Sequence, residues 1–177
     1  MQKGLVVVFT GEGKGKTSAA LGIALRACGH KQYVSMVQFI KSPGNNTGEA
    51  LIAERLAPHF EFTSSGKGFV LGPNGRVSLA EHKKAAQEAL DIARQKMLAG
   101  SWDVLILDEI NNAVKLGLID LAEVLELVKN KPLKLHLVLT GRDAHPDLIS
   151  LADMVTEMRS VKHPYENGVP AQKGIDF

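Results

Sequence analysis

The stretch TGEGKGKT, from Thr10 to Thr17, decides how the rest of the chain is expected to fold. It follows the apolar run LVVVF, which ends at Phe9, and it precedes an Ala- and Leu-rich segment from Ser18 to Ala27. A buried strand, a glycine-rich loop and a helix in this order form the context that a P-loop requires. Backbone N–H groups of such a loop, helped by the positive end of the helix dipole, bind phosphate oxygens. We therefore predict a triphosphate-binding loop here.

Within this loop, Lys16 is expected to reach the phosphates, and the Thr17 hydroxyl is placed to ligate Mg²⁺. One position departs from the usual pattern G-x-x-x-x-G-K-[ST], because Thr10 stands where the first glycine is expected. The alternative interpretation is a glycine-rich turn that only joins a strand to a helix. The complete strand–loop–helix context favours phosphate binding over that alternative.

The composition is that of an ordinary globular protein. The chain of 177 residues fits one domain, from residue 1 to residue 177, with 45% apolar and 23% charged residues. A net charge of +2 without a basic stripe does not indicate a nucleic-acid partner. No apolar run approaches the about 20 residues that span a bilayer, and the first strand leaves no room for a signal peptide. The single cysteine, Cys28, is expected to pack in a helix, and its isolation favours the reducing cytoplasm.

Hydrophobic patterns and turn residues predict alternating strands and helices. Strands are expected at residues 4–10, 33–40, 60–63, 102–107, 133–140 and 154–158, and helices at 17–27, 48–56, 78–99, 120–129 and 146–152. Capping-box sequences, SLAE from Ser78 and DLAE from Asp120, open two of these helices. The alternation predicts an α/β fold of the P-loop NTPase-like (RecA-like) type, with a mainly parallel sheet covered by helices on both faces. From Lys162 onward we expect an extended tail on the surface.

Polar residues follow several of the expected strands, at the sheet edge where α/β proteins bind their ligands. Asp108 and Glu109 come directly after the apolar run VLIL and resemble a Walker B element, whose carboxylates suit Mg²⁺. The alternative for this pair is a helix N-cap. Arg142 follows another strand, and it suits either phosphate binding or a surface ion pair.

Other patterns that could carry chemistry are incomplete in this sequence. The six histidines show no paired spacing for a metal, and no serine or cysteine lies in a nucleophile elbow. Asp143-Ala144-His145 begins like the D-x-H-x-x-G signature of corrin-binding histidines, but Leu148 replaces the required glycine. The apolar loop tip at Phe69–Leu71 suits core packing, a dimer contact or a ligand.

Taken together, the motifs resemble those of the P-loop ATP:corrinoid adenosyltransferases of cobalamin biosynthesis, over nearly the whole chain. The motifs that carry this resemblance are VFTGEGKGKT (8–17), VQFIK (37–41), LDE (107–109), TGR (140–142), LAD (151–153), VKHPY (161–165) with Gly168, AQ (171–172) and GIDF (174–177). A P-loop alone is generic, whereas the loop together with this tail is specific.

The resemblance implies transfer of the 5′-deoxyadenosyl group from ATP to the Co(I) of a reduced corrinoid, with release of triphosphate. In this family ATP lies in the loop with reversed polarity, so that C5′ faces the cobalt nucleophile. The resemblance also implies Mg²⁺, an electron donor such as a reduced flavoprotein, and a homodimer, with no nucleic-acid or membrane partner.

The resemblance gives roles to particular residues. Lys16, Thr17 and Glu109 would be catalytic, and Thr17, Glu109 and Asp108 would hold Mg²⁺ directly or through water. ATP would be bound by Gly11, Glu12, Gly13, Lys14, Gly15, Lys16, Thr17 and Arg142. Phe69 and Leu71 would face the lower side of the corrinoid.

Three departures from the better-known members of the family are visible. Leu71 stands where a tryptophan is expected, and Glu12 replaces an asparagine. Because the first strand is expected just after Met1, we expect no N-terminal extension that folds over the corrinoid.

Two other functions use the same motifs. In a P-loop ATPase or motor, Glu109 would activate water and Arg142 would act as a sensor. In a non-catalytic corrinoid carrier, the loop would bind ATP without transferring a group from it.

Overall fold

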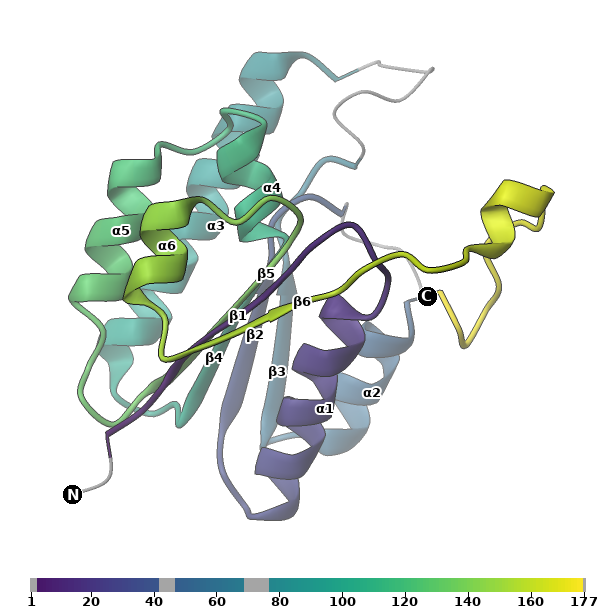
Figure 1. Ribbon diagram of the computed structural model, residues 1–177. Helices are drawn as coiled ribbons and strands as arrows, with labels where there is room; N and C mark the ends of the chain where they lie inside the picture. Colours follow the sequence, from purple (N-terminus) through teal and green to yellow (C-terminus); the bar gives the residue numbers. More distant parts are fainter. Residues whose placement is uncertain (1–2, 42–46, 69–76, 177) are drawn as a thin grey trace.

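The computed structural model describes residues 3–41, 47–68 and 77–176. Six strands form one sheet in the order β3-β2-β4-β5-β1-β6, and every neighbouring pair is parallel (Figure 1). The strands are β1 (Val6–Thr10), β2 (Val34–Gln38), β3 (Phe60–Ser64), β4 (Val104–Asp108), β5 (His136–Thr140) and β6 (Met154–Glu157). The helices are α1 (Lys16–Gly29), α2 (Gly48–Leu56), α3 (Leu79–Ala99), α4 (Ile110–Lys115), α5 (Leu121–Lys129) and α6 (Pro146–Leu151), with a 3-10 turn, η1 (Pro164–Asn167).

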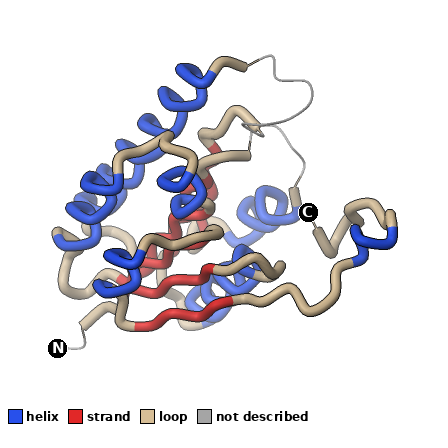
Figure 2. Tube along the Cα trace, turned by 45° about the horizontal axis from the view of Figure 1, so that its top comes forward, coloured by secondary structure: helices blue, strands red, loops and turns tan. Residues whose placement is uncertain are grey.

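Helices cover both faces of the sheet, as the sequence predicts. Strand side chains alternate between two buried clusters, so that Val8 and Leu107 pack with α3, α4, α5 and α6, while Val7 and Ile106 pack with α1 and α2. Figure 2 shows the strands between these two helical layers. The central strands are buried on both faces, which explains why their sequences are continuously apolar.

Most strands are shorter than the sequence patterns predict, whereas β3 extends to Ser64, beyond its predicted end at residue 63. The second strand, for example, begins at Val34 and ends at Gln38, although the Tyr33 carbonyl still accepts from the Val104 N–H at 3.2 Å and the Phe39 N–H donates to the Asp108 carbonyl at 3.0 Å. Helix α2 has the predicted bounds, Gly48–Leu56. Helix α4 was not predicted, and it follows β4 directly from Ile110.

Of the two predicted capping boxes, the one at α3 forms and the one at α5 does not. At α3, the Ser78 hydroxyl accepts a hydrogen bond from the Glu81 N–H at 3.3 Å, the Glu81 carboxylate accepts one from the Ser78 N–H at 2.8 Å, and Gly100 ends the helix in the left-handed region. At α5, Asp120 is the N-cap residue but its side chain makes no capping bond, so the prediction of a second capping box is wrong. The tail is exposed as expected, but it contains η1 instead of being extended throughout.

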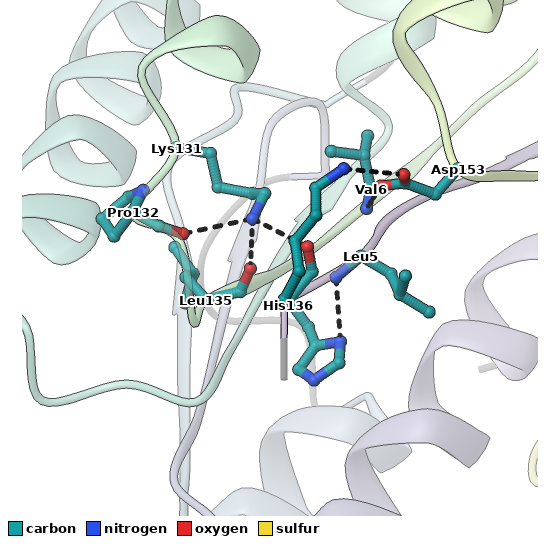
Figure 3. A network of polar contacts seen from close by, with 9 residues as sticks. Leu5, Val6, Lys131, Pro132, Leu135, His136 and Asp153 are labelled. Atoms are coloured by element: carbon teal, nitrogen blue, oxygen red, sulfur yellow. Dashed lines mark hydrogen bonds and ion pairs between the residues drawn. The ribbon is translucent and has the colours of Figure 1, made fainter. Parts of the chain in front are cut away.

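A polar network ties the amino ends of β1, β5 and β6 together (Figure 3). The Lys131 ammonium donates to the carbonyls of Gly4 at 3.0 Å, Pro132 at 3.1 Å and Leu135 at 2.7 Å. The Val6 N–H donates to the Asp153 carboxylate at 2.8 Å, and the Leu5 N–H donates to the His136 ring at 3.2 Å. These contacts occupy the amino edge of the sheet, whereas the chemically interesting side chains gather at the carboxyl edge.

Candidate active site

A cavity of about 880 Å³ opens at the carboxyl ends of the strands. One wall is the glycine-rich loop before α1, and another is formed by helix α2 and Lys41, which follows β2. Glu109 and Arg142 enter from the ends of β4 and β5, and the tail contributes residues 174–176. The topology therefore brings residues from five regions of the sequence into one site.

The glycine-rich loop has the backbone of a tight phosphate loop. Gly11 and Gly15 have φ angles of 93° and 107°, which favour glycine. The loop also lies against the end of β6, where the Gly13 N–H donates to the Met158 carbonyl at 2.7 Å. A Cβ atom on Gly13 would lie 2.8 Å from Met158 and Arg159 backbone atoms. These glycines are therefore needed for packing as well as for loop geometry.

Thr10, the residue outside the usual loop pattern, has a structural role. Its side chain is 7% exposed, and its hydroxyl accepts a hydrogen bond from the Ala144 N–H at 3.0 Å. This bond joins the start of the loop to the segment after β5. Glycine could not make this contact, so the departure from the pattern is compatible with a complete loop.

Lys16 lies at the start of α1, with its ammonium inside the loop. It donates to the carbonyls of Gly11 at 2.7 Å and Gly13 at 2.6 Å, and the residue is 8% exposed. Burial lowers the pKa of Lys16, while the nearby Glu109 carboxylate acts in the opposite direction. A buried ammonium at this place is suited to bind an anion, because phosphate oxygens can replace the carbonyls as acceptors.

Asp108 is the hub of a buried hydrogen-bond network. Its carboxylate accepts from the Thr17 hydroxyl at 2.8 Å, the Thr140 hydroxyl at 2.7 Å and the Gln38 amide at 2.8 Å. Asp108 and Thr140 are fully buried, and Gln38 is 1% exposed. The network holds Thr17 in place beside the end of β4. The structure therefore brings Thr17 and Asp108 together, as the sequence predicts.

Within the described part of the chain, the Glu109 carboxylate lacks the hydrogen-bond partners that the Asp108 carboxylate has. Its φ angle is 65°, which is uncommon for a residue with a side chain, and its buried Oε2 atom has no hydrogen-bond partner among the described residues. Burial raises the pKa of Glu109, and the Asp108 charge raises it further. Glu109 occupies the N-cap position of α4, but its side chain makes no capping bond. The alternative prediction of a helix N-cap therefore places Glu109 correctly, but capping does not explain what the carboxylate does.

Arg142 forms a surface ion pair, which is one of its two predicted interpretations, while phosphate binding stays a prediction. Its guanidinium forms an ion pair with Glu12 at 2.9 Å, and the two side chains are 55% and 61% exposed. It also lines the cavity. Because an exposed ion pair is weak, an anionic ligand can compete with Glu12 for this guanidinium.

The remaining sequence candidates have simpler outcomes. Phe69 and Leu71, the proposed corrinoid contacts, lie outside the described residues. Cys28 packs in the cluster beneath α1, as expected. The rings of His145 and His163 accept hydrogen bonds from the backbone at the starts of α6 and η1. Within residues 3–41, 47–68 and 77–176, no three His, Cys, Asp or Glu side chains form a metal-binding group.

Several residues of the site were not predicted to have a role. Gln38 and Thr140 lie in the motifs VQFIK and TGR, and their contacts with Asp108 depend on the strand order. Lys41 and Glu49, which form an ion pair at 3.2 Å, belong to different elements. Asp176 forms an ion pair with Lys14 of the loop. Apart from Glu49, these residues lie in the family motifs VQFIK, TGR and GIDF, which signal their importance but not their contacts.

The parallel sheet, the glycine-rich loop between β1 and α1, and the acids that follow β4 define an α/β protein of the P-loop NTPase-like class. The family model described as ATP:corrinoid adenosyltransferase BtuR/CobO/CobP matches residues 2–177. The chain therefore belongs to the ATP:corrinoid adenosyltransferase family, which is a family of enzymes.

Curated relatives agree with this assignment. The chain is 40% identical to a corrinoid adenosyltransferase of Escherichia coli strain K12, over 99% of this chain and 87% of the relative. It is 39% identical to a corrinoid adenosyltransferase of a Sinorhizobium species, over 99% of this chain and 81% of the relative. The corrinoid adenosyltransferase CobA of Salmonella typhimurium is 40% identical, over 99% and 87% of the two chains. Within the described part of the chain, every helix is too short or too polar to cross a membrane.

Proposed function

We propose that the protein transfers the 5′-deoxyadenosyl group of ATP to the Co(I) of a reduced corrinoid and releases triphosphate. The corrinoid is cobalamin, cobinamide or cobyrinic acid a,c-diamide, and the reaction serves the biosynthesis or salvage of adenosylcobalamin. The observation that carries this proposal is the family match across residues 2–177, joined to a phosphate-type loop that opens into a cavity of about 880 Å³. The cavity extends beyond the loop and along α2, which leaves space for more than a triphosphate.

The reaction is an in-line displacement at carbon. The Co(I) electron pair forms the Co–C bond to C5′, and the C5′–O bond breaks with its electrons leaving on the triphosphate. No proton is transferred in this step, so no general base is required. The task of the protein is to hold the leaving group and to stabilise its increasing negative charge.

The residues of the loop are suited to this task. In the proposed complex, the N–H groups at the start of α1 and the Lys16 ammonium bind the triphosphate. Lys16 exchanges its bonds to the Gly11 and Gly13 carbonyls for bonds to phosphate oxygens. Arg142 exchanges Glu12 for the same anion. ATP lies with C5′ directed away from the loop, toward the corrinoid.

The site has oxygen donors that fit Mg²⁺, a hard cation that prefers carboxylate, hydroxyl and water ligands. The buried Glu109 Oε2 atom has no partner among the described residues, and it lies next in sequence to Asp108, which holds the Thr17 hydroxyl. We propose that Thr17 and Glu109 hold Mg²⁺, with Asp108 binding directly or through water. The bound ion would neutralise part of the charge on the triphosphate.

Further parts of the proposal rest on the family resemblance. Gly11, Glu12, Gly13, Lys14 and Gly15 complete the ATP site, and Phe69 and Leu71, outside the described residues, contact the lower face of the corrinoid. The chain acts as one domain over residues 1–177, forms a homodimer and receives electrons from a donor such as a reduced flavoprotein. The lone cysteine supports a reducing, cytoplasmic environment.

Product analysis tests the proposal. The protein is incubated with ATP, Mg²⁺ and chemically reduced cobalamin or cobinamide, and the absorbance change is followed. We expect a light-sensitive Co–C bond and one equivalent of triphosphate. Formation of ADP and phosphate would instead identify an ATPase. Corrinoid turnover that is unchanged in Lys16→Ala would remove ATP chemistry and favour a carrier.

A further inference from the structure

Lys41 lines the same cavity as the glycine-rich loop, and hydrogen bonds and close packing hold its backbone. The Ser64 hydroxyl donates to the Lys41 carbonyl at 2.7 Å, and the Gly68 N–H donates to the neighbouring Ile40 carbonyl at 2.8 Å. Gly66 packs so closely that a Cβ atom on it would lie 2.1 Å from the Ile40 carbonyl. The segment that follows β3 therefore fixes the backbone from which the Lys41 side chain extends.

The side chain of Lys41 is held at its other end as well. Its ammonium lies 3.2 Å from the Glu49 Oε1 atom, and the Glu49 side chain is only 7% exposed. Glu49 is in the first turn of α2, where the helix dipole favours a negative charge. A buried carboxylate in this place is costly unless it is paired, so the ion pair is expected to persist.

The Lys41 ammonium retains capacity to bind a ligand. An ammonium has three N–H donors, and among the described residues Glu49 accepts the one side-chain hydrogen bond that Lys41 makes. Lys41 is 33% exposed and lines the cavity with Lys16 and Arg142. The positive charge of Lys41 also acts on Glu109, whose pKa it lowers in opposition to burial. The ammonium thus adds positive charge to the cavity that Glu109 also lines.

We propose that Lys41 binds the triphosphate of ATP in the cavity that it lines together with the loop, and that Glu49 is the residue that positions it. This inference rests on the proposed function, because it gives a further binding residue for the same leaving group. In this arrangement Lys16 and Lys41 hold the triphosphate from two elements, α1 and the end of β2. The increasing charge on the leaving group is shared between them.

The test measures binding of inorganic triphosphate with Mg²⁺ by titration calorimetry. Lys41→Ala would leave Glu49 buried and unpaired, so the main variant is Lys41→Gln/Glu49→Gln, in which an amide pair replaces the ion pair and the net charge of the pair stays zero. We expect the affinity for triphosphate to fall by about 10- to 100-fold, the usual effect of one charge-assisted hydrogen bond. The affinity for adenosine should be unchanged.

Lys3→Ala is the matched control. Lys3 is also a lysine paired with a carboxylate, at 3.0 Å from Asp153, but it lies at the amino edge of the sheet. Its triphosphate affinity should remain within about twofold of the parent protein, since simple loss of a distant surface charge has little effect in salt. An amide-pair variant that binds triphosphate as tightly as the parent would overturn the inference.

A second variant tests the positioning role of Glu49. Glu49→Asp keeps the charge but shortens the side chain, so it should weaken triphosphate binding several-fold and raise the KM for ATP but not for the corrinoid. The same change made in Lys41→Ala should have no further effect on triphosphate binding. An equal effect in both backgrounds would show that Glu49 acts without Lys41.

The two levels of the proposal fail in different ways. Normal adenosyl transfer with Lys41-independent triphosphate binding would reject the inference and retain the proposed function. Lys41-dependent triphosphate binding without adenosyl transfer by the parent protein would retain the anion site and reject the proposed reaction.

Discussion

At the residue scale, Glu109 combines features that reduce stability. Its φ angle of 65° is strained for a residue with a Cβ atom, and its buried Oε2 atom has no partner among the described residues. Burial also disfavours its charged form. Such a combination is typical of functional sites, where an unsatisfied group is retained because a ligand uses it.

This leads to a prediction for Glu109→Gln in buffer without Mg²⁺. The variant should be more stable than the parent by about 1 kcal/mol at pH 7, because an uncharged amide costs less to bury than a carboxylate. Adenosyl transfer should fall at least tenfold. Urea unfolding and the corrinoid absorbance assay measure the two effects. Loss of activity together with loss of stability would indicate a structural role instead.

The stability difference should also depend on pH. The pKa of Glu109 is raised in the folded protein above its ordinary value of 4.5, so the folded state binds the proton more tightly than the unfolded state does. The loss of stability caused by burying the charged Glu109 carboxylate is therefore absent at pH values below 4.5, and it grows as the pH rises through the folded pKa. A difference in unfolding free energy between the parent and Glu109→Gln that stays constant from pH 4 to pH 8 would contradict this explanation.

At the element scale, the glycine-rich loop depends on the end of β6. The Gly13 N–H donates to the Met158 carbonyl, and the backbone of residues 158 and 159 leaves no space for a side chain at this position. We predict that Gly13→Ala destabilises the protein by about 1–3 kcal/mol, the usual cost of overpacking. Its KM for ATP should rise as the loop shifts. Chemical denaturation and steady-state kinetics measure both quantities.

Gly22→Ala, on the exposed side of α1, serves as the control for this prediction. A Cβ atom at Gly22 meets no atom within 4 Å. Because alanine favours a helix interior, this variant should be more stable than the parent by about 0.5–1 kcal/mol. If both variants gain stability, the close contact between the loop and β6 is absent in solution.

The edge strand β6 is anchored to β1 by Asp153. Its carboxylate accepts from the Val6 N–H at 2.8 Å and from the Lys3 ammonium at 3.0 Å, and the two interactions lower the pKa of Asp153. We predict that Asp153→Ala destabilises the protein at neutral pH. The contribution of the parent carboxylate is complete above its ordinary pKa of 3.8 and is lost as the pH falls through the folded value.

Urea unfolding of parent and variant between pH 3 and pH 7 tests this prediction. The difference in unfolding free energy should shrink as the pH decreases. Asp153→Asn keeps an acceptor for the Val6 N–H but has no charge. Its unfolding free energy at neutral pH should therefore lie between those of the parent and Asp153→Ala, and its difference from Asp153→Ala should change little with pH. A parent-to-alanine difference that grows in acid would show that the anchor is not the carboxylate.

The sequence predicts most elements but not all of their ends. Helix α2 was predicted within its observed bounds because Pro58 follows it closely and the preceding loop is rich in Gly and Asn. Helix α4 was missed, since it has six residues and two of them, Asn111 and Asn112, are weak helix formers. It forms because Ile110 and Ala113 are completely buried against the sheet, which local sequence does not show.

At the scale of the whole molecule, the parallel sheet assembles the site. The predicted residues Lys16, Thr17, Glu109 and Arg142 all line one cavity because the strands β1, β4 and β5 end at the same edge. Each has a recognisable motif next to it in sequence. Lys41 lies in the VQFIK motif but has no predicted role there, and Glu49 lies outside the motifs; their pairing depends on where the fold places the first turn of α2. Residues whose role depends on tertiary packing were therefore not predictable from sequence.

The same architecture predicts that a ligand stabilises the entire fold. The proposed triphosphate site is built from α1, the ends of β2, β4 and β5, and the tail, so unfolding any of these elements destroys it. At a concentration of 100 times Kd, triphosphate with Mg²⁺ should raise the unfolding free energy by about 2.7 kcal/mol. In Lys16→Ala this gain should largely disappear, whereas in Leu98→Ala, which changes an exposed side chain of α3, it should persist. Differential scanning calorimetry over a range of triphosphate concentrations measures the shift, and a Lys16→Ala protein that is stabilised like the parent would show that triphosphate binds elsewhere.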